Sequence, residues 1–192
     1  MQILQTLKQR AMQVNGTIVL PESFDERTLR AAEMITTQGI AKVILIGRSE
    51  EILADAKSKE INISECKIID PINSEEIADF AEAYYLKRKD KGVSKEIALQ
   101  TMQNGLFFGA MLVKHNLASG MVAGAANTTA DVLRAALQVV GVMPGLKTVS
   151  STFIMVSPRE NDPTLLFADC AVVPNPTDEQ LADIASSRSE ER

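Results

Sequence analysis

The sequence predicts an α/β fold with three layers, in which helices cover both faces of a mostly parallel sheet. Short runs of consecutive apolar residues, such as 17–20 and 42–46, have the length and composition of strands buried on both sides. Segments with helical spacing of apolar residues lie between these runs, so that strands and helices alternate along the chain. Ligands of such folds usually bind at the carboxyl ends of the strands.

The first half of the chain contains the elements of βαβ units. Apolar runs predict strands over 17–20, 42–46 and 66–69, and helical spacing predicts helices over 3–13, 25–38, 50–58 and 74–89. Pro21 ends the first strand, and Gly39 closes the second helix. The sequence therefore predicts neighbouring parallel strands joined by helical crossovers.

The second half continues this alternation and then changes in character. The expected elements are helices over 94–103 and 106–114, a strand over 119–122 and a helix over 129–140. After Pro144, apolar runs over 148–156 and 165–173 flank a turn-rich segment and predict an antiparallel hairpin. A last helix over 177–187 begins at the capping residue Thr177.

We expect a domain boundary where the character changes. Residues 1–146 form the predicted N-terminal α/β domain, and residues 147–192 form the start of a second α/β domain, with one hairpin and one helix. Such a small segment buries too little apolar surface to be stable alone. We therefore expect it to dock on another surface or to continue beyond residue 192.

Composition excludes several classes of function. The chain of 192 residues is 45% hydrophobic and has a formal net charge of −5, which gives no overall attraction to nucleic acid or to an anionic membrane. It contains neither a membrane-spanning run nor a signal peptide, so we expect a cytoplasmic protein. Cys66 and Cys170 lack metal-ligand spacing, so we expect reduced thiols and no metal site.

A candidate phosphate-binding helix start follows the strand over 119–122. The small residues 123–126 let the backbone approach a ligand, and Thr128 is a good N-cap for a helix that begins at Thr129. Free N–H groups and the helix dipole favour an anion there, and Arg134 lies within two turns. The alternative is purely structural, because junctions of this kind occur throughout α/β proteins.

A basic block over 84–92 is the second candidate for chemistry. It contains Lys87, Arg88, Lys89 and Lys91 near the end of a helix, and the guanidinium of Arg88 suits bidentate phosphate binding. The alternative is again structural, because basic residues at a helix C-terminus interact favourably with the dipole. His115 lacks a partner for metal binding or catalysis at suitable spacing, and we expect it, like Cys170, to be structural.

Six segments together resemble the phosphate acetyltransferase family, also called phosphotransacetylase. The segments, in order, are IVLPE at 18–22, DERTLRAA at 25–32, YYLKRKDKG at 84–92, MVAGAANTTADVLRAALQ at 121–138, VSSTFIM at 149–155 and LFADCAVVPNPTDEQLADIA at 166–185. The similar phosphate butyryltransferases are the alternative within this resemblance.

The resemblance implies reversible transfer of an acetyl group between acetyl phosphate and coenzyme A. Acetyl phosphate, phosphate, coenzyme A and acetyl-CoA are the implied ligands, all as substrates or products, with no bound cofactor and no metal. It also implies a two-domain homodimer with an architecture similar to isocitrate and isopropylmalate dehydrogenases.

The resemblance also assigns residues. Arg88 and Arg134 fall on substrate-site arginines, and Thr128 and Thr129 add hydrogen bonds to the phosphate. The family residues that activate the coenzyme A thiol have no counterpart in this chain, so we expect the general base beyond Arg192 and weak or absent activity. The ending SSRSEER differs from the small and apolar residues of the family and indicates a truncated or shifted reading frame. Ala135 lies where the family commonly has proline, a change that need not abolish binding. The alternative is a noncatalytic fragment that binds phosphate or associates with another subunit.

Overall fold

The computed structural model describes residues 2–159 and 162–188. The chain divides into two compact units, residues 1–140 and residues 141–192, and each is described by itself. The division into an N-terminal α/β domain of residues 1–146 and the start of a second domain at residue 147 stays a prediction.

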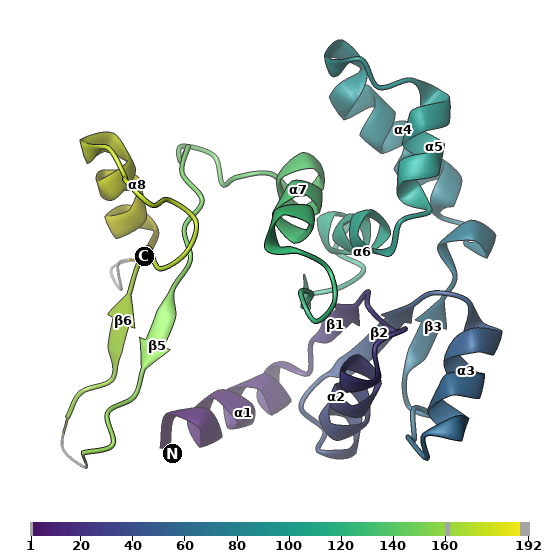
Figure 1. The fold of residues 1–192 in the computed structure, drawn as a ribbon, viewed down its shortest axis with the longest axis horizontal. Helices are drawn as coiled ribbons and strands as arrows, with labels where there is room; N and C mark the ends of the chain where they lie inside the picture. The colour runs from purple at the N-terminus through teal and green to yellow at the C-terminus, as the bar shows by residue number, and fades with distance from the viewer. Residues whose placement is uncertain (1, 160–161, 189–192) are drawn as a thin grey trace. The chain divides into compact units, whose positions relative to one another are not determined.

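A four-stranded parallel sheet forms the centre of the first unit (Figure 1). Its strands are β1 (Thr17–Leu20), β2 (Lys42–Ile46), β3 (Lys67–Ile69) and β4 (Gly120–Met121). Their order is β3-β2-β1-β4, so the chain first builds the sheet to one side of β1 and then returns to the other side. This reversal places a topological switch point, where α/β proteins usually bind ligands, between β1 and β4.

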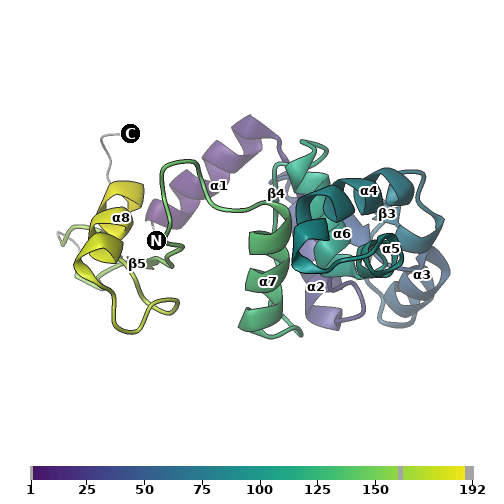
Figure 2. The ribbon, with the colours of Figure 1, turned by 90° about the horizontal axis from the view of Figure 1, so that it is seen from above.

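Helices cover both faces of this sheet. The elements around it are α1 (Gln2–Val14), α2 (Glu26–Thr37), α3 (Ser49–Ser58), η1 (Pro71–Asn73), α4 (Ile77–Arg88), η2 (Lys89–Lys91), α5 (Lys95–Met102), α6 (Gly105–Lys114) and α7 (Thr129–Val139). Figures 1 and 2 show α6 and α7 side by side, and these two helices are in contact. The prediction of a parallel sheet flanked by helices is confirmed.

The alternation of side chains along each strand creates two apolar clusters. Leu20 and Leu45 pack with residues of α2 and α3 such as Leu29, while Val19 and Ile44 on the opposite face pack with α4 to α7. This arrangement explains why the strands are continuous apolar runs in the sequence. No helix in the described part of the chain is long and apolar enough to cross a bilayer.

The second unit contains a two-stranded antiparallel hairpin and one helix. The hairpin pairs β5 (Phe153–Met155) with β6 (Leu165–Phe167), and the helix is α8 (Asp178–Arg188). Thr177 and Gln180 cap α8 reciprocally, because the backbone N–H of each donates to the side-chain oxygen of the other. The predicted hairpin and final helix are therefore present.

The two hairpin strands are shorter than the predicted runs over 148–156 and 165–173. Backbone N–H groups just outside them donate to carboxylates instead of to a neighbouring strand. Asp183 accepts from Lys147 and Thr148, and Asp169 accepts from Ser151 and Val172. The prediction of long strands was wrong because apolar, β-branched composition does not reveal these side-chain acceptors.

Candidate functional site

The junction between β4 and α7 has the strand, loop and helix order that the sequence predicted. Thr128 has extended backbone angles and is the N-cap of α7, which begins at Thr129. Its hydroxyl accepts from the N–H of Asp131 at 3.2 Å and donates to the carboxylate of Asp131 at 2.6 Å. The predicted cap is confirmed, and it fixes the first turn of the helix.

The loop before this helix already surrounds an anion, which is the side chain of Glu22. Gly124 and Ala125 each donate a backbone N–H to Oε2 at 2.8 Å. Ala126 and Asn127 donate theirs to Oε1 at 3.0 and 2.6 Å, and the side-chain amide of Asn127 adds a bond of 2.8 Å. Only 1% of Glu22 is exposed. The small residues of this loop were predicted from the sequence as a close approach to a ligand, but the role of Glu22, which directly follows β1 and Pro21, was not.

These hydrogen bonds determine the charge state of Glu22. Burial raises the pKa of the Glu22 carboxyl, but hydrogen bonds from Asn127, Ala126 and Ala125 more than offset burial and lower the pKa from 4.5 to about 2. Glu22 is therefore ionised at neutral pH. A ligand anion meets a loop whose four consecutive backbone donors already have an acceptor.

The first turn of α7 retains unused donors. The N–H groups of Thr129 and Ala130 have no hydrogen-bond acceptor in the part of the chain that the structure describes. Backbone donors at a helix start, together with the helix dipole, attract anions. The first turn of α7 thus offers the N–H groups of Thr129 and Ala130, ahead of Arg134 on the same helix, and the anion site at Thr128 and Thr129 stays a prediction.

Arg134 lies on the exposed surface of α7. Its Nη1 atom is 2.8 Å from the Asp131 carboxylate, and the two side chains are 55% and 41% exposed. The pKa of Asp131 is lowered, chiefly by the hydrogen bond from the Thr128 hydroxyl and in addition by this ion pair with Arg134. A guanidinium has five donors, so this one contact leaves others for a ligand.

Arg88, at the end of α4, has a buried donor without a partner. Its Nε atom is excluded from solvent and has no hydrogen-bond acceptor among the described residues. Such atoms are rare in proteins, and a ligand is one of the ways in which they become satisfied. The predicted role of Arg88 in substrate binding is consistent with this geometry and stays a prediction.

Two hydrogen bonds join the ends of the helices that carry these arginines. The Tyr84 hydroxyl donates to Oε1 of Gln138 at 2.5 Å, and the Lys87 ammonium donates to the carbonyl oxygen of Val139 at 2.6 Å. Tyr84 and Lys87 lie within about one turn of Arg88, and Gln138 lies about one turn beyond Arg134. The structure therefore links the two segments that the sequence singled out.

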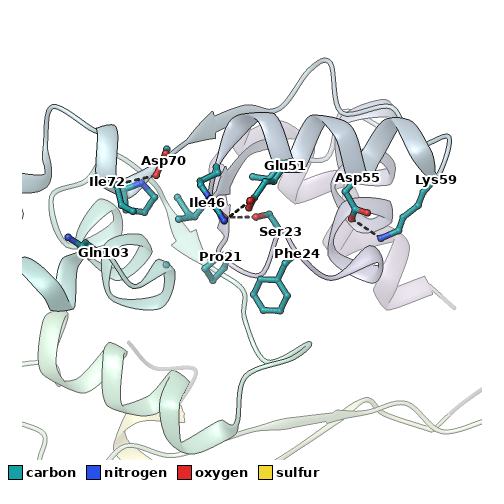
Figure 3. Close-up of a pocket in the computed structure, with 15 residues that line it drawn as sticks. Pro21, Ser23, Phe24, Ile46, Glu51, Asp55, Lys59, Asp70, Ile72 and Gln103 are labelled. Carbon is teal, nitrogen blue, oxygen red and sulfur yellow. Dashed lines mark hydrogen bonds and ion pairs between the residues drawn. The ribbon is translucent and has the colours of Figure 1, made fainter.

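A separate cavity of about 460 Å³ lies at the carboxyl ends of β1, β2 and β3. Figure 3 shows Ser23 and Phe24 on one side of it and, on the other, Glu51 and Asp55 of α3 with Lys59, which directly follows this helix. Its charged lining residues are Arg48, Lys59, Glu51, Asp55 and Asp70. Acidic residues outnumber basic ones, and Arg48 and Lys59 already pair with carboxylates, so this cavity is poorly suited to phosphate. It includes neither predicted arginine.

His115 and Cys170, which were predicted from the sequence to be structural, contact neighbouring side chains in the fold. The ring of His115 lies 5.0 Å from that of Phe80, at the C-terminal end of α6. Cys170 contacts the hydroxyl of Ser151, with 3.2 Å between Sγ and Oγ. Within residues 2–159 and 162–188, no group of three or more His, Cys, Asp or Glu side chains is placed to hold a metal ion.

The sequence of this chain matches a protein-family profile and several curated proteins. The profile described as phosphate acetyl/butaryl transferase matches residues 2–191. Phosphate acetyltransferase from Acetivibrio thermocellus is 45% identical over 192 residues, which cover 98% of this chain and 57% of that protein. The chain thus spans somewhat more than half the length of this curated relative.

Solved structures agree with the sequence comparison. EutD phosphotransacetylase from Staphylococcus aureus matches with a TM-score of 0.86 and 34% identity, over 96% of this chain and 55% of that chain. A phosphotransacetylase from Streptococcus pyogenes matches with a TM-score of 0.88 and 36% identity, over the same shares. Both the sequence and the fold therefore match across nearly all of this chain.

Proposed function

Because the chain belongs to the phosphate acetyl/butaryl transferase family over residues 2–191, we propose that it binds the phosphate group of acetyl phosphate as part of a phosphate acetyltransferase. The reaction is the reversible transfer of an acetyl group between acetyl phosphate and coenzyme A. The family match is the observation that carries this proposal. Acetyl is favoured over butyryl because curated relatives that are 45%, 44% and 43% identical to this chain are named phosphate acetyltransferases.

Arg88 and Arg134 are the proposed phosphate ligands. The unsatisfied Nε of Arg88 and the exposed guanidinium of Arg134 supply donors that a phosphate accepts well. Two hydrogen bonds join α4 and α7 near these arginines, which supports their acting on one substrate. The N–H and the hydroxyl of Thr129 are the proposed additional donors at the helix start. Thr128 is also proposed to contact the ligand, and its hydroxyl would then exchange its bond to Asp131 for one to the phosphate.

The proposed chemistry uses charge stabilisation by these groups. The thiolate of coenzyme A attacks the acetyl carbonyl carbon, a thioester bond forms, and the bond between this carbon and the phosphate oxygen breaks. Inorganic phosphate leaves with the bonding electron pair, and the two guanidinium groups stabilise its growing negative charge. Coenzyme A is a substrate in this proposal, no bound cofactor or metal is assigned, and no general base is assigned among the described residues.

Binding measurements test the phosphate site directly. We expect calorimetric titration of the 192-residue chain with acetyl phosphate to give a measurable affinity, which falls at least about tenfold in Arg88→Ala and in Arg134→Ala, as expected when a charge-assisted hydrogen bond is lost. Arg30→Ala is the matched control, because Arg30 is an exposed arginine paired with Glu26 on α2. Equal affinity in all four proteins would contradict the proposal.

Turnover and assembly are separate measurements. Formation of acetyl-CoA from acetyl phosphate and coenzyme A tests the reaction, and butyryl phosphate in parallel tests the acyl preference. Binding that requires both arginines, without turnover, would favour the noncatalytic alternative. A homodimer is proposed from the family resemblance, and light scattering of the purified chain tests it.

A further inference from the structure

Glu22 is a buried carboxylate whose five hydrogen-bond donors all belong to one short loop. The donors are the backbone N–H groups of residues 124–127 and the side-chain amide of Asn127, at 2.6 to 3.0 Å. Burying an ionised carboxylate is costly unless hydrogen bonds replace the lost water. Here the donors come from a segment 102 residues away in sequence, so the carboxylate connects two distant parts of the chain.

We propose that Glu22 is a positioning residue that fixes the conformation of residues 123–127 and, through it, the first turn of α7. This inference rests on the proposed function of α7 as the carrier of Thr128, Thr129 and Arg134. Four consecutive N–H groups point at one carboxylate only when the loop is concave. A different loop conformation therefore breaks several of these bonds together.

The small side chains of residues 123–126 allow the loop to surround the Glu22 carboxylate. Gly124 has a φ of +108°, a conformation that side chains rarely permit, and Ala125 and Ala126 add only methyl groups. The sequence over 123–127 thus fits a loop that wraps around an anion. In this chain the anion is supplied by the end of β1, next to the switch point of the sheet.

A second contact holds the same loop through a carbonyl group. The guanidinium of Arg27 donates to the carbonyl oxygen of Ala125 and is itself held by Asp25, with 2.9 Å between Nε and Oδ1. Glu22, Asp25 and Arg27 all belong to the connection between β1 and α2 or to the first turn of α2. The β1–α2 connection therefore restrains both the donors and an acceptor of the loop.

The restraint has a direct consequence for the ligand. Because Glu22 occupies the amides of residues 124–127, a phosphate is directed to the first turn of α7 and the arginines. A rival arrangement is that Glu22 competes with phosphate for the loop amides. The two differ in sign: loss of the Glu22 charge weakens phosphate binding when Glu22 positions the site, and strengthens it when Glu22 competes.

Amide hydrogen exchange and phosphate binding test this inference on the full chain. We expect Glu22→Gln to raise the exchange rates of the amides of residues 124–127 by at least about tenfold, because the new amide group faces N–H donors. Inorganic phosphate should bind about tenfold more weakly, with unchanged helical content. Glu22→Asp keeps the charge and should restore part of the slow amide exchange and part of the phosphate affinity. Glu26→Gln is the matched control, an exposed glutamate that pairs with Arg30, and should change neither.

Each outcome decides a separate question. Unchanged exchange in Glu22→Gln overturns the proposal, and so does faster exchange with unchanged or stronger phosphate binding. Failure of the parent chain to bind phosphate instead overturns the proposed function, while exchange still decides whether Glu22 holds the loop. Should Glu22→Gln not fold, Asn127→Ala removes one of the five donors and keeps the carboxylate. A rise in exchange confined to this loop is then expected, and its absence overturns the proposal.

Discussion

Tyr84 on α4 donates a hydrogen bond of 2.5 Å to Gln138 on α7. The neighbouring bond from Lys87 to the carbonyl oxygen of Val139 spans the same two helices. Both donors precede Arg88 by about one turn or less, and both acceptors follow Arg134. These bonds therefore join the two helices that carry the predicted phosphate ligands.

Tyr84→Phe should weaken both the fold and the phosphate site. The ring stays buried beside Phe107, so the change removes only the hydroxyl. We expect urea unfolding to show a loss of about 1 kcal/mol, and calorimetry to show weaker acetyl phosphate binding. Tyr85→Phe, on the same helix, is the control. Unchanged affinity despite lower stability would mean that the link between the helices does not control the site.

Asp131→Asn should strengthen acetyl phosphate binding. The carboxylate of Asp131 lies 2.8 Å from Arg134 and offsets part of its charge. Removal of one exposed ion pair is expected to raise affinity about threefold, with a small loss of stability from the weaker helix start. Titration calorimetry measures the affinity at low salt. Weaker binding would show that Asp131 orients Arg134 instead of competing for it.

Glu22 should make the free energy of unfolding depend on pH in acid, because its pKa in the folded chain lies below that of an ordinary glutamate. Its pKa is lowered from 4.5 to about 2 in the folded chain, so the unfolded chain takes up a proton first as the pH falls. Its contribution is complete above about pH 5 and disappears towards about pH 2, by up to about 3 kcal/mol.

Denaturant unfolding at several pH values checks this dependence. The difference in unfolding free energy between the parent chain and Glu22→Gln should shrink as the pH falls through that window. A difference that is constant with pH would show that the carboxylate is not held in its ionised form.

Phe108→Ala should be strongly destabilising. Phe108 is 0% exposed and its ring centroid lies 5.2 Å from that of Phe80. We expect a loss of about 3–5 kcal/mol in urea unfolding, because the deletion leaves a cavity. Phe24→Ala, with 68% of the residue exposed, should cost less than about 1 kcal/mol. Similar losses at both positions would contradict the described packing of α6.

The sequence was sufficient for most elements because their signals are local. The strand β1 at Thr17–Leu20 coincides with its apolar run, and the helix starts at Thr129 and Asp178 follow the capping residues Thr128 and Thr177. A cap acts within about one turn, so a short stretch of sequence contains the whole interaction. Parallel pairing also followed, because alternating buried strands and helices leave few other topologies.

Interactions between distant segments were not predictable in the same way. The contact of Glu22 with residues 124–127 requires the fold to exist before the partners meet. A single glutamate after a proline looks like an ordinary strand end in the sequence. The same reason applies to the residues before β5, where the N–H groups of Ser151 and Thr148 donate to Asp169 and Asp183, 18 and 35 residues further along the chain. The arginines Arg88 and Arg134 were identified by resemblance, and their roles stay predictions.

Gly109 of α6 is a buried position that affects the proposed phosphate site indirectly, through helix packing. A Cβ atom at this position of α6 would lie 2.9 Å from Sδ of Met121 and 3.1 Å from Cγ1 of Val19, so a larger residue forces these strand side chains or the helix to shift. Helix α6 in turn supports α7. In a screen of variants for the proposed phosphate binding, weakened variants should therefore arise at Gly109 as well as at the two arginines, with no change of charge at the glycine.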